Sequence, residues 1–336
     1  MMRVMSRSCV LSLCLCACVV DTDQTSSIEQ PGIQMQGIQM QGIQMQGIQM
    51  QGMSLVGFQV DGATWNGAPL SNVHVQAGGV VANIGAYTLS GTALTGARFY
   101  AQARNLNVDP PATAIAQYRI TAVAPESFVY DPTYTGATYL YTLEQWVADT
   151  SSWQSACAPD ADGRRVAIPL AATWDERGNR VESSSLFTFG CTTGVIAKCY
   201  RWGYRPWVTG YGDLVTTHQI CTRMARADYC GNGVPHTRDG TQVNVWDTLP
   251  PPGPIQRHGW LTPLGMVFEA GWDTGGAVCL SRERWLLGDG LAIAAMCPDR
   301  LVPPGLGETV CDTVGEVLGY DADVKLFNES YLNLGL

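Results

Sequence analysis

The chain has 336 residues, of which 46% are hydrophobic and 15% charged, and its formal net charge is −9. This length and this hydrophobic content are enough for one large or two modest globular domains. An acidic chain repels the phosphate backbone of nucleic acids, so the composition excludes nucleic acid as the main partner.

The first 18 residues have the layout of a bacterial export signal. Arg3 and Arg7 precede an apolar run from Val10 to Val20 that is too short to span a membrane. The sequence LCAC at 15–18 resembles a lipobox, in which a small residue precedes the cysteine that receives the lipid. We therefore expect cleavage before Cys18 and stable anchoring by the acyl chains on that cysteine. The alternative is a soluble secretory signal that merely contains cysteines.

A polar tether at 19–31 leads into a segment, 32–76, that begins with pentapeptide repeats. GIQMQ occurs four times without change from Gly32 to Gln51. A period of five fits neither a strand nor an α-helix, but it is the period of a four-sided β-helix. Stacked repeats need several neighbours to bury a continuous core, and isoleucine stands where such coils usually carry a small residue. The repeats are predicted to form either a short β-helix-like stack or a flexible stalk.

Short apolar or alternating runs separated by turn residues follow the repeats. Such runs predict antiparallel strands. We place a β-rich N-terminal part of the globular region at 77–155 and a disulfide-rich domain at 156–336. The predicted fold class is β-rich α+β, with antiparallel strands, few helices and disulfide cross-links. Strands are expected at Gly79–Ala82, Ala97–Ala103, Ala116–Val123, Tyr139–Val147 and Arg165–Ala172.

Eight cysteines lie beyond Cys18, and an even number in an exported chain favours disulfides. Sequence alone does not choose among the possible pairings. Each bridge that closes a loop of a few tens of residues would stabilise the fold by roughly 2–4 kcal/mol. The spacings are too wide for a zinc knuckle, and we expect neither a metal nor a cofactor. The disulfide candidates are Cys157, Cys191, Cys199, Cys221, Cys230, Cys279, Cys297 and Cys311.

Helical periodicity is found over residues 213–227, where Asp213 is the predicted N-cap. The helix is predicted to end near Tyr229, because Gly231 and Gly233 can adopt the left-handed conformation that closes helices. The apolar face carries Leu214, Cys221, Met224 and Ala225, with His218 as a core histidine, and the opposite face carries Arg223 and Arg226.

Three blocks around this helix resemble the ADYC domain family. They are FTFGC at 187–191, AKCYRWGYRPW at 197–207 and HQICTRMARADYCGNGVPHTRDGT at 218–241. Fainter similarity continues in AGWDTGGAVCLSRERW at 270–285 and LFNES at 326–330. The family consists of secreted bacterial proteins found mostly in myxobacteria. The resemblance implies a domain and export, but it brings no activity, cofactor or site residue.

The WGYRPW segment is a candidate binding element. Pro206 cannot stand in a central strand, so the neighbouring rings are expected on a loop or a sheet edge. Trp202, Tyr204 and Trp207 could there stack on a sugar or a peptide.

A second candidate site follows Cys230. His236 and Asp239 stand after a Gly-Asn-Gly turn and could act as a base and its orienting carboxylate. In the alternative interpretation the loop hydrogen-bonds to itself, with Asp239 capping the next two residues.

These features predict a lipid-anchored protein of the cell envelope, at the outer membrane or the cell surface. Its role outside the inner membrane would be binding or structural, with the membrane as one partner through the anchor and an envelope glycan or protein as ligand. The alternative is a secreted hydrolase acting on glycan or peptide, with His236 and Asp239 in its site. No lipase-type serine elbow, zinc-protease motif or phosphate-binding glycine loop occurs in the sequence.

Overall fold

The structure is a computed structural model, and its described residues belong to the second of two compact units, which spans Gly32–Leu336. The described residues are 49–50, 53–54, 58–105, 112–126, 138–160, 162–175, 177–183, 186–237, 241–259, 264–284, 293, 295–300 and 311–331. The export signal, Cys18, the tether and Asp239 lie outside them. Of the repeats only β1 (Gln49–Met50) is described, and it pairs with β2 (Met53–Ser54), so the choice between a β-helix and a stalk stays a prediction.

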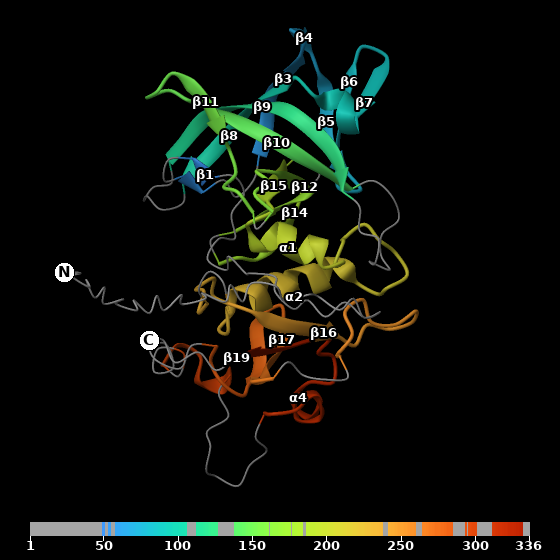
Figure 1. Cartoon of the computed structure of the whole chain (residues 1–336), viewed down its shortest axis with the longest axis vertical. Coiled ribbons are helices and arrows are strands. Elements are labelled where there is room, and N and C mark those ends of the chain that lie inside the picture. The colour runs from blue at the N-terminus through green and yellow to red at the C-terminus, as the bar shows by residue number, and fades with distance from the viewer. Residues whose placement is uncertain are drawn as a thin grey trace, which may run out of the picture. The chain divides into compact units, whose positions relative to one another are not determined.

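The largest sheet closes on itself (Figure 1). All its pairings are antiparallel, and they run from β3 through β8, β9, β10, β12 and β15 back to β3. The ring consists of β3 (Phe58–Trp65), β8 (Ala97–Asn105), β9 (Ala112–Glu126), β10 (Thr138–Val147), β12 (Ala167–Leu170) and β15 (Leu186–Cys191). The short strands β4 (Ala68–Pro69) and β11 (Ser152–Ser155) extend it at β3 and β10.

Alternation of side chains explains why these runs form strands. In β9, Ala116, Tyr118 and Ile120 are buried, whereas the residues between them point outward. Phe99, Leu143, Phe187 and Phe189 from the other strands fill the same interior. A small sheet of β5 (Ser71–Gln76), β6 (Gly79–Ile84) and β7 (Tyr87–Ser90), followed by the 3₁₀ turn η1 (Gly91–Leu94), packs against this core.

A second sheet lies between two helices. Its strand order is β16 (Val243–Asp247), β19 (Leu326–Tyr331), β17 (Met266–Asp273) and β18 (Gly276–Leu280). Val243, Val245 and Trp272 face α2 (Leu214–Arg226), while Trp246 and Phe327 lie on the opposite face with α4 (Val314–Tyr320). Helix α1 (Val195–Arg201) packs beside α2, and the remaining elements are β13 (Ala172–Trp174), β14 (Arg180–Glu182) and η2 (Pro298–Arg300).

The eight cysteines form four disulfides among themselves. The pairs are Cys157–Cys191, Cys199–Cys221, Cys230–Cys297 and Cys279–Cys311. They close separations of 34, 22, 67 and 32 residues, so each restricts the unfolded chain considerably. The predicted disulfide cross-links and the β-rich α+β class are confirmed. None of the helices in the described part of the chain has the length and apolar character needed to cross a membrane.

Three local expectations need correction. Helix α2 ends at Arg226, earlier than predicted, because Ala227 and not a glycine takes the left-handed conformation. The strand expected at 165–172 is divided between β12 and β13. Helices α1 and α4 were not predicted from the sequence, although Thr313 and Glu316 form a capping box whose T-x-x-E spacing marks the start of α4.

Candidate functional site

Helix α2 supplies the frame for the candidate site. The Asp213 side chain accepts a hydrogen bond from the Thr216 backbone N–H at 3.1 Å, as predicted for an N-cap. Hydrogen bonds from the Thr216 side chain and from backbone amides outweigh the effect of burial and hold the pKa of Asp213 below its usual value. At the other end Ala227 turns the chain, and the four residues 227–230 that follow the helix read ADYC.

Each residue of the ADYC segment has a distinct structural role. Ala227 adopts φ 51° and ψ 43° and closes α2. The buried Asp228 carboxylate accepts hydrogen bonds from the amides of Asn232 at 3.1 Å and Gly233 at 3.0 Å, which fixes the Gly-Asn-Gly turn. Tyr229 lies in the core, and Cys230 forms the disulfide with Cys297. The segment therefore converts a helix end into a rigid, cross-linked turn.

Asp228 is paired with a fully buried arginine, Arg223. The same guanidinium donates to the backbone oxygens of Arg177 at 2.5 Å and Thr274 at 3.1 Å, and to Asn179 Oδ1 at 2.6 Å. Arg223 thus joins α2 to the turn between β13 and β14 and to the turn between β17 and β18. Helical periodicity predicted Arg223 on the face opposite the apolar stripe, and that face is buried at Arg223 because three chain segments converge there.

A second buried ion pair lies at the C-terminal end of α2. Arg284 donates to both carboxylate oxygens of Glu269, at 3.0 and 2.8 Å, and both side chains are fully buried. Arg284 also donates to the carbonyl oxygens of Met224 at 2.9 Å and Ala225 at 3.3 Å, where a helix end favours a cation. Burial raises the pKa of Glu269, but the charge and hydrogen bonds of Arg284 and a hydrogen bond from Ser330 outweigh it and leave the pKa lowered.

Tyr229 connects this ion pair to a stack of rings. Its hydroxyl donates to Glu269 Oε1 at 3.2 Å and accepts from the Arg284 backbone N–H at 2.9 Å. Its ring stacks on Trp272 at 5.4 Å and on His236 at 5.6 Å. Burial, followed by the negative charge of Glu269, raises the pKa of Tyr229 well above its usual value. The phenol therefore stays protonated, and its hydroxyl links Glu269 to the Arg284 backbone.

His236, one of the two catalytic candidates, is a core residue. It is 5% exposed, it stacks on Tyr229, and its backbone N–H donates to the Arg226 carbonyl oxygen at 3.1 Å. The imidazole is thus not displayed on the loop, which the catalytic interpretation of the sequence requires. The reason is the turn set by Asp228, which folds the loop back over the end of α2. Asp239 lies outside the described residues.

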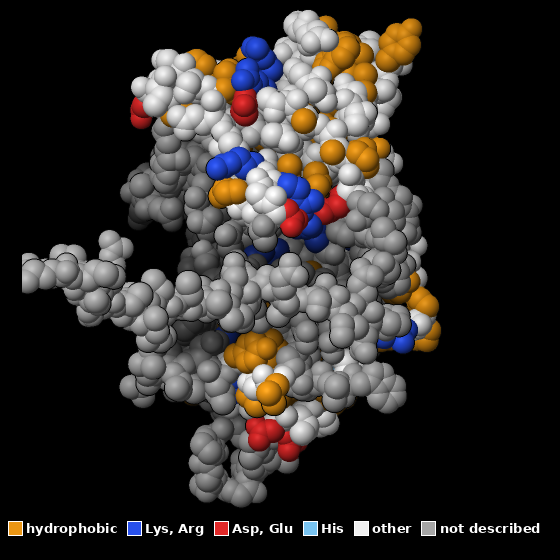
Figure 2. Space-filling view, in the orientation of Figure 1, with side chains coloured by type: hydrophobic (Ala, Val, Ile, Leu, Met, Phe, Trp, Pro, Cys, Tyr) orange, Lys and Arg blue, Asp and Glu red, His pale blue; other side chains and the backbone are white. Residues whose placement is uncertain are grey.

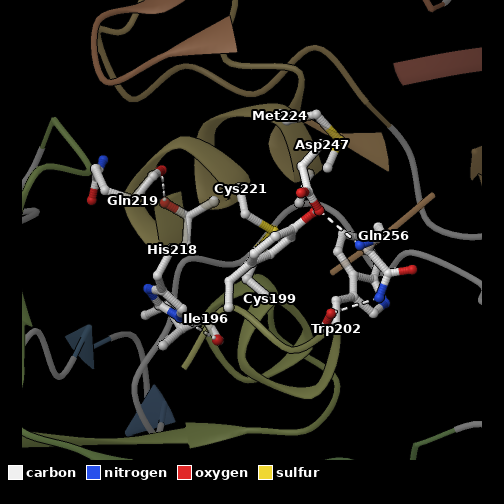
Figure 3. Close-up of a disulfide and its surroundings, with 12 residues drawn as sticks. Ile196, Cys199, Trp202, His218, Gln219, Cys221, Met224, Asp247 and Gln256 are labelled. Carbon is white, nitrogen blue, oxygen red and sulfur yellow. Dashed lines mark hydrogen bonds between the residues drawn. A yellow bond between two sulfur atoms is a disulfide. The ribbon is translucent and has the colours of Figure 1, made fainter. Parts of the chain in front are cut away.

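The WGYRPW rings are mostly buried, contrary to the expectation that they are displayed. Trp202 is 3% exposed and Tyr204 is fully buried, with its hydroxyl 3.1 Å from Asp247 Oδ2. The Cys199–Cys221 disulfide draws α1 onto α2, so the turn after α1 lies against β16 instead of facing solvent (Figure 3). Trp207 is half-buried, with its ring 4.6 Å from that of Tyr200, and is the most accessible of the three.

His218 is the core histidine that the helical pattern predicted. It points from α2 to the Ile196 carbonyl oxygen, with Nε2 at 3.0 Å, and is fully buried (Figure 3). Burial, aided by the positive charge of Arg180, lowers the pKa of His218 to about 3. The ring is therefore neutral at physiological pH, with Nε2–H as the donor.

One histidine that the sequence analysis did not single out pairs with a carboxylate near the surface. His258 Nε2 lies 3.1 Å from Glu329 Oε1, and Asn244 donates to Glu329 Oε2 at 2.8 Å. The His258 side chain is 41% exposed, and its ring meets the edge of Trp246 at 4.4 Å. The pairing of β16 with β19 brings Asn244 to Glu329, and the loop after β16 brings His258 to the same carboxylate, so no local signal could have found them.

The two ion pairs near α2 hold the surrounding elements in place. None of their four described side chains is exposed to solvent, where it could act on a substrate. Within the described ranges no cluster of three or more His, Cys, Asp or Glu side chains could hold a metal ion.

Comparison with known proteins gives one match. The family model described as ADYC domain matches residues 91–286, which is more than half of the chain. The matched range runs from η1 through β8–β15 and the helices α1 and α2 to β18, so β3 of the closed sheet lies outside it. No curated protein and no solved structure matches the chain.

Proposed function

This chain belongs to the ADYC domain family, and on that premise we propose that it is a cell-envelope protein, anchored through lipid at Cys18, with a binding or structural role outside the inner membrane. The observation that carries the proposal is the pairing of all eight cysteines beyond Cys18 into four disulfides. Structural disulfides form and persist in oxidising compartments, which for a bacterial protein lie outside the inner membrane.

The geometry around α2 favours binding or structure over catalysis. Its charged residues are engaged by one another, and the histidine proposed as a base is stacked in the core. A hydrolase needs a base within reach of a substrate proton. Among the described residues, His258 and Glu329 offer the hydrolase alternative a histidine–carboxylate pair with partial solvent access.

The anchor is proposed from the sequence LCAC and from acyl-chain energetics. Several acyl chains on one cysteine hold a protein on a membrane where a single chain would not. Cys16 offers a matched control, since leucine and not a small residue precedes it.

The anchor is tested by growing cells that express the full chain with a clickable fatty acid. We expect label on the parent and on Cys16→Ala, and no label on Cys18→Ala, which should leave the membrane fraction. An unlabelled parent, or label that persists in Cys18→Ala, would contradict the lipid anchor.

Export is tested separately by alkylation without reduction. None of the eight paired cysteines should be modified in protein isolated from cells. Stoichiometric modification of several of them would mean that the chain resides in a reducing compartment and that the proposed location is wrong.

A further inference from the structure

The outer face of the closed sheet carries a cluster of arginine and tryptophan side chains over β8–β11. The ladder places Arg98 opposite Arg119 and Arg119 opposite Glu144, while Trp146 is opposite Trp153. On β8, β9 and β10 the burial of Arg98, Arg119, Glu144 and Trp146 alternates with that of core residues, so these side chains lie on the outward face. Trp153 shares that face because it pairs with Trp146. Figure 2 shows basic side chains beside acidic and hydrophobic ones over this part of the sheet.

Trp153 is the centre of this cluster. The Arg119 guanidinium carbon lies 4.6 Å from the centroid of its ring and that of Arg98 5.8 Å, both within cation–π range. Trp146 meets the Trp153 ring edge-on, with the centroids 5.6 Å apart. Both indoles are half-buried, so each keeps part of its ring in solvent. The contacts hold the rings in place before any ligand arrives, which lowers the entropy cost of binding.

The cluster contains two arginines and one glutamate, so positive charge is in excess. Glu144 neutralises Arg119, with Arg119 Nε donating to Oε2 at 2.5 Å. Arg98 is exposed, and it forms no ion pair with any residue that the structure describes. The cluster therefore has a net positive charge in a chain whose formal net charge is −9. A cationic site on an otherwise acidic protein attracts an anionic group of the ligand to that part of the surface.

Polar groups continue the cluster along the sheet. Tyr100, 37% exposed, stands opposite Gln117 in the ladder of β8 and β9. A hydroxyl and an amide next to two indoles offer donors and acceptors beside flat apolar rings. This combination matches a pyranose, which has one apolar face of C–H groups and a rim of hydroxyls.

We propose that the outer face of β8–β11 binds an acidic saccharide, with a sugar ring on the exposed part of Trp153 and Trp146 and its carboxylate on Arg98. Arginine can meet a carboxylate with two parallel hydrogen bonds, which fixes the orientation of the sugar. The proposal rests on the proposed role outside the inner membrane and names the class of ligand for it.

The test uses the purified full chain and measures binding of oligogalacturonate, an acidic sugar polymer, by isothermal titration calorimetry. Maltohexaose serves as the neutral saccharide, polyglutamate as the acidic peptide and phosphatidylglycerol vesicles as the anionic surface. We expect binding of oligogalacturonate over the other three. Arg98→Gln should weaken it about tenfold, the loss of one charge-assisted contact, and Trp153→Ala should weaken it further.

Two variants keep the result interpretable. Tyr87→Ala removes a 76%-exposed ring on the separate β5–β7 sheet and should bind like the parent. Arg98→Gln removes a charge from an exposed side chain, so its fold, checked by circular dichroism, should be unchanged. Equal affinity of Arg98→Gln and the parent, no binding of oligogalacturonate by the folded parent, or preference for polyglutamate or vesicles would each overturn the proposal. Because the assay uses purified protein, these outcomes are independent of the anchor and export tests.

Discussion

Protonation of His218 should destabilise the fold between pH 6.5 and about 3. The ring is fully buried, its Nε2–H donates to Ile196, and within the described part of the chain Nδ1 has no hydrogen-bond partner. The pKa of His218 is lowered to about 3 in the folded protein, chiefly by burial, whereas an unfolded histidine titrates near 6.5. The unfolded chain therefore binds a proton in this window that the folded chain does not.

The linkage sets the sign and the size of the effect. Above pH 6.5 neither state is protonated, and the group does not change the stability. Each pH unit below that value costs about 1.4 kcal/mol, so the loss at pH 5 is about 2 kcal/mol. His218→Gln keeps a side-chain N–H donor for Ile196 but cannot titrate, so this loss should disappear in it.

The assay is urea unfolding at pH 7 and pH 5, followed by tryptophan fluorescence with the disulfides intact. The parent should lose about 2 kcal/mol more than His218→Gln on going to pH 5. His74→Gln, which alters a histidine on β5 whose ring bonds the Asn72 carbonyl oxygen of the same strand, should behave like the parent. If the parent and His218→Gln lose equal stability, proton uptake at His218 does not limit the acid stability and the reasoning fails.

Three further changes test the contacts and the disulfide that hold the chain at the C-terminal end of α2. Gly231→Ala should destabilise the fold by about 3 kcal/mol or more in urea unfolding, since its Cβ would lie 1.9 Å from the Gly275 oxygen. Gly85→Ala is the control, because Gly85 has a similar φ but open space around it, and it should cost only about 1 kcal/mol. Arg284→Met should cost about 3–5 kcal/mol by leaving the Glu269 charge unpaired, and the double change with Glu269→Gln should recover part of this loss; full additivity would refute the coupling. Mild reductant should open Cys230–Cys297, whose residues are half-buried, before the buried Cys199–Cys221 pair, and mass spectrometry after alkylation should find the first labels at Cys230 and Cys297.

Local patterns determined much of this protein. Alternation in the run 116–123 predicted a strand of the closed sheet, because one side of every strand must face an interior. Asp213 and the apolar spacing behind it predicted the start of α2 and the burial of His218. The even number of cysteines, together with the predicted export signal, predicted that they pair.

Tertiary structure decided what local patterns do not encode. The burial of His236, Trp202 and Tyr204 depends on partners far away in the chain, such as Asp247, which is 43 residues from Tyr204. The burial of Arg223 was not predicted, because helical periodicity records the spacing within one helix and not the segments that pack around it. Segments far apart in the sequence must come together before three features can form: the cysteine pairs, the ion pair of Arg284 with Glu269, and the arginine–tryptophan cluster across β8–β11. The register of the strands is set by the complementary surfaces of the whole core.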